Sequence, residues 1–356
     1  MKKKLFIPGP IDVSGDVLNQ MQKPMISHRS KDASALQKSI SLKLQKVFHT
    51  KNQIILSTSS GSGLMEGPIR SCTRKKAAVF SVGAFGDRWY KMALSNNVPA
   101  DVFRVESGKI ITGEMVDEVL KTGSYDLITI THNETSTGVM NPLDDISRVL
   151  KDYPNVIWCV DAVSSMGGTK IEVDKLGIDI CITSTQKSLG LPPGLAIASM
   201  SEKAVKAAEK VKNRGTYFDL LTIYNVIKNK DHQYPSTPNL PLMYALDYQL
   251  DKMLKEGLDN IYKRHLEMAN YVRKWAKENF EIFPNEKYSS DTVTAIKNTK
   301  NIDIPTFIKN VEEKGYIISN GYGDLKNKTF RIAHMGDYSL EDVKALINTM
   351  NEVLEI

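Results

Sequence analysis

The chain has 356 residues, of which 41% are hydrophobic, and it is long enough to bury a sizeable core in one large and one smaller domain. Its 47 basic and 41 acidic side chains are interspersed, which argues against a basic stripe that binds nucleic acid. No apolar run approaches the length of a transmembrane helix, so the sequence predicts a soluble, cytoplasmic protein without a membrane partner.

Amphipathic spacing predicts a first helix, in which Leu36, Ile40, Leu44 and Val47 lie on one face. From residue 53 to residue 200, short apolar runs alternate with helical patterns, which is typical of an α/β domain built on a mostly parallel sheet. The expected strands span residues 53–57, 77–82, 126–131, 156–161, 179–184 and 195–200.

The three cysteines do not have the spacing of metal ligands. Two of them, Cys159 and Cys181, lie in the strand-like runs, whereas Cys72 lies outside them. We therefore expect three buried thiols and no metal site.

After Pro241 the pattern changes to one long helical stretch that continues to Trp275 and indicates a connector helix. Two further strands are expected at residues 291–296 and 329–334, followed by a last helix that begins after Ser339 with the pattern of a capping box. These elements indicate a smaller α/β domain.

The predicted boundary between the two domains lies at residue 240. The large domain is expected to span residues 16–240, and the small C-terminal domain residues 241–356. The N-terminal segment, residues 1–15, is expected to pack near the small domain.

Ligands of open parallel sheets bind at the carboxyl ends of the strands, so the residues after each strand carry information about function. Residues 59–66 form a glycine-rich turn that runs into a helix, an arrangement that suits a phosphate group, although such turns are also common without a ligand. Phe85 follows the next strand, where its ring either covers a flat ligand or folds back into the core. Residues 131–138 are dense in short hydrogen-bonding side chains, and the role of His132 among them stays open.

Asp161 closes the fourth strand, and Lys187 follows the fifth. Taken singly, Asp161 is explained as a cap of the next turn and Lys187 as a surface lysine. Taken together with the phosphate turn, the aromatic ring and the hydroxyl cluster, they fit pyridoxal 5'-phosphate (PLP), which needs an acid at its ring nitrogen and a lysine at its aldehyde.

Seven motifs in this order resemble the class V, fold-type I aminotransferases, and in particular their serine–pyruvate and alanine–glyoxylate group. The resemblance covers nearly the whole chain. The motifs are Pro8-Gly-Pro10, Ser60-Gly-Ser-Gly63, Gly83-Ala-Phe-Gly-Asp-Arg-Trp89, His132-Asn-Glu-Thr-Ser-Thr-Gly138, Asp161-Ala-Val-Ser-Ser-Met-Gly-Gly168, Ser184-Thr-Gln-Lys187 and Pro192-Pro-Gly194. The resemblance implies a mostly parallel, seven-stranded sheet in the large domain, PLP as cofactor, and transfer of an amino group from serine or alanine to pyruvate or glyoxylate.

The resemblance also implies a role for individual residues. Lys187 would form the Schiff base with PLP and move the substrate's α-proton, and Asp161 would keep the ring nitrogen protonated. The remaining cofactor contacts would come from Phe85 and Val163 on the two faces of the ring, Thr135 at the phenolic oxygen, and Ser62, Gly63, Leu64 and Gln186 at the phosphate.

The substrate and the partner subunit are assigned in the same way. Arg331 would bind the substrate carboxylate, with Gly9 of the Pro8-Gly-Pro10 motif beside it. From this sequence alone, Arg331 is equally well explained as a solvated arginine at a sheet edge. Tyr234 and Thr237 match positions that reach the phosphate from the neighbouring subunit, so a homodimer with a shared site follows.

Two residues depart from the commonest pattern of the family. Leu64 stands where many relatives have Thr or His, which leaves the backbone N–H as the phosphate contact. Phe85 takes a place held by Trp in some members, which changes the stacking area.

Several other functions share some of these features. A cysteine desulfurase needs a catalytic cysteine in the C-terminal third, where this chain has none. A 2-aminoethylphosphonate-type transaminase, for which Gln186 is atypical, and a PLP lyase of the same fold stay open as alternatives. A nicotinamide-dependent dehydrogenase lacks its glycine motif here, since Glu66 takes the third glycine's place. A non-catalytic relative could dispense with Lys187 or Arg331, and both are present. The role of His28 stays open.

Overall fold

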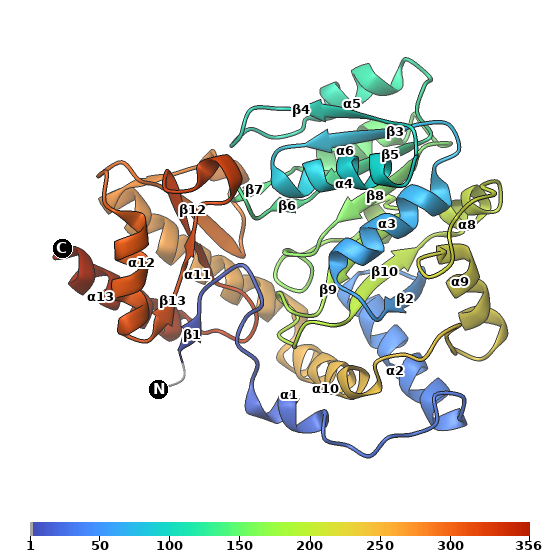
Figure 1. Cartoon of the computed structure of the whole chain (residues 1–356), viewed down its shortest axis with the longest axis horizontal. Helices are drawn as coiled ribbons and strands as arrows, with labels where there is room; N and C mark the ends of the chain where they lie inside the picture. The colour runs from blue at the N-terminus through green and yellow to red at the C-terminus, as the bar shows by residue number, and fades with distance from the viewer. Residues whose placement is uncertain (1–2) are drawn as a thin grey trace.

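The computed structural model describes residues 3–356 and contains a seven-stranded sheet that forms the centre of the larger part of the molecule (Figure 1). All neighbouring strands are parallel except one strand, which is antiparallel to both of its neighbours. The predicted mostly parallel, seven-stranded sheet is therefore confirmed. In spatial order the strands are β2 (Gln53–Ser57), the antiparallel β10 (Ala196–Met200), β9 (Ile180–Ser184), β8 (Ile157–Asp161), β5 (Leu127–Thr131), β3 (Ala77–Ser81) and β4 (Ala100–Arg104).

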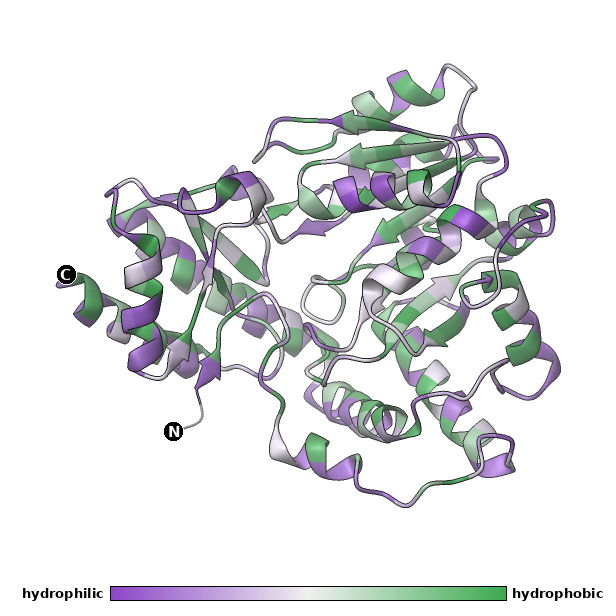
Figure 2. Cartoon of the chain, in the orientation of Figure 1, coloured by the Kyte–Doolittle hydropathy of each residue, from purple (hydrophilic) through white to green (hydrophobic). Residues whose placement is uncertain are grey.

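The central strands are buried along their whole length, which explains why they appear in the sequence as continuous apolar runs. Figure 2 shows the strands of this sheet largely in the hydrophobic colour. Strand β4 was not predicted. It is an edge strand that contains Asp101 and Arg104 and is only partly buried, so its residues do not form an apolar run.

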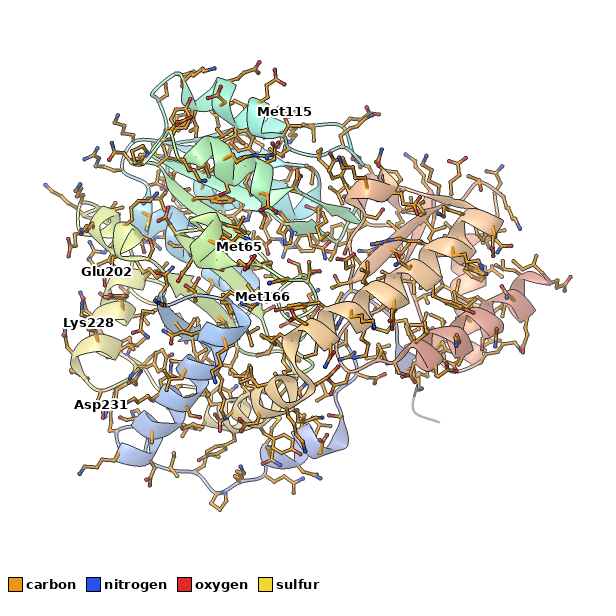
Figure 3. All side chains as sticks on the ribbon, turned by 180° about the vertical axis from the view of Figure 1, so that it is seen from behind. Met65, Met115, Met166, Glu202, Lys228 and Asp231 are labelled. Atoms are coloured by element: carbon orange, nitrogen blue, oxygen red, sulfur yellow. The ribbon has the colours of Figure 1, made fainter. Side chains whose placement is uncertain are left out.

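The larger part of the molecule also contains helices on and around the large sheet. They are α3 (Gly61–Cys72), α4 (Ala84–Ser95), α5 (Gly113–Leu120), α6 (Leu143–Leu150), α7 (Val173–Leu176), α8 (Glu202–Ala208), α9 (Leu220–Asn229), α1 (Gly15–Gln20) and α2 (Lys31–Val47). On the predicted helix α2, the side chains of Ile40, Leu44 and Val47 are buried as expected. Figure 3 shows Met65 of α3 and Met166 in the interior, whereas Glu202 of α8 and Lys228 of α9 lie at the outer surface.

A second, antiparallel sheet lies in the C-terminal part (Figure 1). Its side chains, with Phe6 from the N-terminal segment, form a hydrophobic cluster around Phe330. The N-terminal strand β1 (Lys4–Leu5) pairs with β13 (Tyr316–Ile317) beside this cluster. The sheet consists of β11 (Glu281–Ile282), β12 (Val293–Lys297), β15 (Thr329–Ala333) and β14 (Ser319–Asn320), and it packs with α11 (Leu258–Asn279), α12 (Ile304–Glu313) and α13 (Leu340–Leu354).

The prediction of a single connector helix is wrong, because this stretch of the chain forms two helices. Gly257 has φ of 88° and separates α10 (Leu240–Glu256) from α11, since a positive φ cannot continue a right-handed helix. The buried side chains of α10 belong to the core of the large sheet. The division at residue 240 stays a prediction, and this packing favours a boundary nearer Gly257.

The capping box of α13 is present: the Asp342 N–H donates to Ser339 Oγ at 3.3 Å, and the Ser339 N–H donates to Asp342 Oδ2 at 2.9 Å. All three cysteines are buried and free, as expected. Within residues 3–356, no helix combines the length and the apolar character needed to span a bilayer.

Candidate active site

Asp161 and Lys187 meet at the carboxyl edge of the large sheet. Asp161 is the last residue of β8, and Lys187 follows the end of the neighbouring parallel strand β9 by three residues. The two strands run side by side with Asp161 opposite Ile182. The structure thus brings together an acid and an amine that are 26 positions apart in the sequence.

The Lys187 side chain is half buried, and its ammonium group donates to the carbonyl oxygen of Pro8. Burial lowers the pKa of Lys187 to about 8; the charge of Asp161 opposes this shift, and the charges of Arg331 and Arg88 add to it. An amine with this pKa is far more often neutral near pH 7 than an ordinary lysine, and a nucleophile or a base requires the neutral form.

The N-terminal segment closes over this lysine. Gly9 has φ of 97°, and a Cβ atom at this position would lie 2.7 Å from Lys187 Cδ and 2.9 Å from its Nζ. No side chain fits there, so the backbone of the Pro8-Gly-Pro10 motif can approach the amine closely. The predicted substrate residue Gly9 therefore lies in contact with the predicted Schiff-base lysine.

Asp161 is 4% exposed, and its Oδ1 accepts the N–H of Val163 at 2.9 Å. Burial raises the pKa of Asp161 to about 6; the Val163 hydrogen bond opposes the shift, the charge of Glu134 adds to it, and the charges of Lys187 and Arg88 oppose it. A cationic partner, such as a protonated ring nitrogen, stabilises the charged form of a buried carboxylate strongly.

His132 is hydrogen-bonded to the backbone of Asp161. Its backbone N–H donates to the Asp161 carbonyl at 2.8 Å, and its Nδ1 lies 2.9 Å from Ser165 Oγ. Burial lowers the pKa of His132 to about 4, so the ring is neutral at physiological pH. These contacts place His132 beside the predicted acid, and its role stays open. His28 lies half buried in the segment between α1 and α2, and no role follows from its position.

The predicted phosphate turn is the first turn of helix α3. The helix begins at Gly61 and contains Ser62, Gly63 and Leu64 in its first turn, where backbone N–H groups lack partners within the helix. The Leu64 side chain is fully buried, so only its backbone N–H can serve a ligand here. A Cβ atom on Gly61 would lie 2.6 Å from Val163 Cγ2, so the helix start lies directly against the predicted ring contact.

Two buried polar atoms of the segment that leads from β9 to Lys187 have no partner within residues 3–356. They are the Oε1 atom of Gln186 and the Oγ atom of Ser184. The latter would lie 3.5 Å from a Cβ atom on Gly61. Buried polar atoms are usually hydrogen-bonded, and a phosphate group in the turn would supply the missing partner.

Phe85 lies in the first turn of α4 and is only half buried, so its ring does not fold back into the core. The buried carboxylate of Glu134 holds it in place: Oε2 accepts the N–H groups of Phe85 at 2.9 Å and Gly86 at 3.1 Å. Glu134 belongs to the hairpin of β6 (Asn133–Glu134) and β7 (Val139–Met140). Burial raises the pKa of Glu134, while its hydrogen bonds oppose that shift.

Arg331 is not a solvated arginine at a sheet edge. It is 8% exposed on β15, an inner strand of the small sheet. Its Nε donates to the carbonyl of Asn320 at 3.0 Å, and its Nη1 donates to the carbonyl of Thr135 at 3.0 Å. Burial lowers the pKa of Arg331 to about 10, and no carboxylate within residues 3–356 lies within 4.0 Å of its guanidinium group.

Tyr234 and Thr237 do not join the other residues within one chain. The Tyr234 hydroxyl accepts the Gln37 Nε2–H at 2.6 Å and the Leu56 N–H at 2.9 Å, so it is already engaged. Thr237 is exposed in the loop that precedes α10. Their contact with a neighbouring subunit stays a prediction, and Thr237 is the freer of the two.

Sequence reasoning gave no role to three residues of the site, Arg88, Glu134 and Tyr322. The Arg88 guanidinium lies 4.6 Å from the centre of the Phe85 ring, and a signal was available, because residues three apart share a helix face. Tyr322, whose ring lies 5.9 Å from that of Phe85, comes from the small sheet's loop, and no local pattern marks it.

The residues present fit PLP. The site offers a buried acid, a lysine with a lowered pKa, a half-buried aromatic ring and a helix start flanked by unpartnered polar atoms, and glycines at positions 9, 61 and 63 leave space where a Cβ atom would collide. These are the groups that PLP requires of a protein.

Comparison with known proteins agrees with this chemistry. The family model "Aminotransferase class-V" matches residues 14–323. An uncharacterized aminotransferase of Methanocaldococcus jannaschii is 39% identical, over 98% of this chain and 91% of that protein. A serine–glyoxylate aminotransferase of Methylorubrum extorquens is 31% identical, over 94% of this chain and 87% of that protein.

The fold of the chain is also similar to that of a solved structure. The crystal structure of an alanine–glyoxylate aminotransferase from Nostoc sp. superposes with a TM-score of 0.94 at 25% identity, covering 99% of this chain and 96% of that one. The match extends over both sheets and the helices between them. The chain belongs to the class V aminotransferases, which are PLP-dependent transaminases of fold type I.

Proposed function

We propose that this aminotransferase moves the amino group of a small amino acid, serine or alanine, to a 2-oxo acid, pyruvate or glyoxylate. One observation carries the proposal: Arg331 is a buried cation whose charge acts on Lys187, and it has no carboxylate partner among the described residues. A cation with these properties suits the carboxylate that every amino acid and 2-oxo acid carries. The substrates named for the relatives support the choice.

The carbonyl groups of Asn320 and Thr135 fix the plane of the Arg331 guanidinium. A guanidinium held in this way binds both oxygens of a carboxylate and thereby orients the amino acid. The amino group then faces Lys187, whose lowered pKa makes it a base for the α-proton. When bound, PLP supplies a cationic ring that accepts the electron pair left by this proton, and Asp161 keeps the proton on the ring nitrogen.

The assignments of the cofactor contacts follow the same logic. Phe85 and Val163 would contact the two faces of the ring, Thr135 its phenolic oxygen, and Ser62, Gly63, Leu64 and Gln186 its phosphate. Desulfuration finds no support, because burial raises the pKa of Cys72, Cys159 and Cys181 and keeps these thiols protonated.

We also propose that the enzyme is a homodimer in the cytoplasm. Two exposed hydrophobic residues belong to segments linked to the loop with Thr237: Tyr217 lines a cavity with Tyr234 and Pro235, and Met25 precedes Arg29, which donates to the Pro235 carbonyl. Exposed apolar side chains gathered around one loop are typical of an interface.

The proposed substrate class is tested by half-reaction kinetics with Arg331→Lys, which keeps the charge but loses the planar pair of donors. L-Serine and L-alanine serve as donors, ethylamine, which has no acidic group, is the comparison, and wild type is also tested with 2-aminoethylphosphonate. We expect the variant to lose about ten- to a hundredfold in kcat/KM with the two amino acids and little with ethylamine. Equal losses for all donors would remove Arg331 as the carboxylate site, and a wild-type preference for the phosphonate would replace the proposed function by the phosphonate alternative.

A further inference from the structure

Arg88 contacts two parts of the proposed cofactor site, the ring of Phe85 and the first turn of α3. It lies one turn after Phe85 on α4, and its guanidinium carbon is 4.6 Å from the centre of the Phe85 ring. Its Nη1 donates to Ser62 Oγ at 2.6 Å. Ser62 is the second residue of α3, so the guanidinium is in contact with both the ring that covers the cofactor and the turn that receives its phosphate.

The charge of Arg88 is not neutralised by the protein. Within residues 3–356, no carboxylate lies within 4.0 Å of its guanidinium nitrogens. The neighbouring Asp87 is engaged elsewhere, since its Oδ1 accepts from Arg104 Nε and from Ser81 Oγ, both at 2.8 Å. The charge of Arg88 nevertheless reaches the site, because it favours the anionic form of Asp161 and the neutral form of Lys187.

The other groups assigned to the phosphate leave its charge largely uncompensated. A bound phosphate monoester carries about −1.5 to −2 charges near pH 7. Ser62, Gly63, Leu64 and Gln186 are neutral, and the start of a helix contributes only about half a positive charge. Leu64 adds no polar side chain. A full positive charge beside this turn would therefore balance the phosphate charge that the neutral groups leave uncompensated.

We propose that Arg88 is the counter-ion of the cofactor phosphate. Its guanidinium bonds to the phosphate oxygens while it remains packed on the Phe85 ring, so that one side chain couples phosphate binding to the position of the ring contact. Arginine suits both tasks, because its planar group bonds to phosphate with two parallel N–H groups and stacks on aromatic faces. The inference rests on the proposed assignment of the phosphate site.

The test compares the binding of PLP with that of pyridoxal, which lacks the phosphate. Apoenzyme is titrated with each compound, and dissociation constants are measured from the absorbance of the bound compound for wild type, Arg88→Gln, Arg88→Lys and Lys91→Gln. Lys91 is the matched control, since it is an exposed cation on the same helix, three residues on. Thermal unfolding of each apoenzyme shows whether the variants fold.

We expect Arg88→Gln to weaken PLP binding about ten- to a hundredfold and to leave the dissociation constant of pyridoxal within about twofold. Arg88→Lys should recover part of the loss, and Lys91→Gln should behave as wild type. Equal weakening of PLP and pyridoxal would overturn the inference, because Arg88 would then act only through Phe85 or the fold. Unchanged PLP binding would also overturn it.

Two further results keep the outcomes distinct. If Arg88→Gln does not fold, the preference of wild type for PLP over pyridoxal is measured at rising salt, and Arg88→Lys is compared with it. An ion pair predicts a preference that falls with salt and is smaller in the lysine variant; a preference that responds to neither change would contradict it. A wild type that binds no PLP would instead overturn the proposed cofactor site as a whole.

Discussion

Burial moves the two central ionisable groups of the site in opposite directions. The same loss of water raises the pKa of the Asp161 carboxyl to about 6 and lowers that of the Lys187 amine to about 8, since it disfavours each charged form. Each residue partly opposes the shift of the other. These opposite shifts suit the proposed roles of Lys187 as a base and of Asp161 as the partner of a cationic ring nitrogen.

The pKa of Lys187 predicts how cofactor capture depends on pH. Below about 8 the amine is protonated and has no free electron pair, whereas above this value it is neutral. We expect the rate constant for covalent capture of PLP by apoenzyme to rise roughly tenfold between one pH unit below and one above the pKa. Stopped-flow absorbance measures the rate, and borohydride reduction followed by peptide mapping locates the bond.

Lys187→Ala provides the control for this experiment and should form no reducible bond at position 187. A rate constant that stays flat across the same pH interval would contradict the lowered pKa. A reducible bond at another lysine would remove Lys187 as the anchor.

At the scale of elements, the site is built from the starts of two helices. Helix α3 brings its first turn against Val163, and helix α4 brings Phe85, which Glu134 holds by two hydrogen bonds to backbone N–H groups. Both helices follow strands that run in the same direction as β8 and β9, so their N-termini lie at the carboxyl edge of the sheet with Asp161 and Lys187. We expect the packing of these helix starts to set the width of the proposed cofactor site.

Gly61→Ala tests this packing. The added Cβ atom would lie 2.6 Å from Val163 Cγ2, so either α3 or Val163 has to move. We expect a loss of about 1–3 kcal/mol in unfolding free energy and weaker PLP binding. Chemical denaturation and PLP titration measure the two effects.

Gly15→Ala is the matched control, because Gly15 also begins a helix and a Cβ atom there would meet nothing within 4 Å. It should be neutral or slightly stabilising. A Gly61→Ala variant as stable as wild type, with unchanged PLP binding, would show that the helix start tolerates the shift.

The elements differ in how well the sequence predicts them. Buried parallel strands such as β8 and β9 appear as unbroken apolar runs, and their ends identify Asp161 and Lys187 directly. The edge strand β4 contains Asp101 and Arg104 and lacks such a run, and the break at Gly257 is hidden inside a continuous helical pattern. Local patterns also cannot reveal contacts between distant residues, such as that of Lys187 with Pro8, 179 positions away.

At the scale of the whole molecule, three parts of the chain contribute to one site. The N-terminal segment supplies Gly9, the large sheet supplies Asp161 and Lys187, and the small sheet supplies Arg331. The hydrogen bond from Arg331 to the Thr135 carbonyl joins the two sheets across 196 positions of sequence. The distance between carboxylate site and amine thus depends on how the two sheets pack, which a resemblance of motifs alone does not specify.

The proposed homodimer extends this argument to a second chain and gives the last prediction. Thr237 is exposed, its loop lines a cavity together with the exposed Tyr217, and its hydroxyl is expected to reach the phosphate of the partner. Thr237→Ala should raise the dissociation constant of PLP about two- to tenfold, the effect of one neutral hydrogen bond. The control is Ser236→Ala, which removes an exposed hydroxyl from the same loop and should leave PLP binding unchanged. Sedimentation at falling concentration should show that PLP affinity drops as the dimer dissociates, and a monomer that binds PLP with full affinity would rule out a shared site.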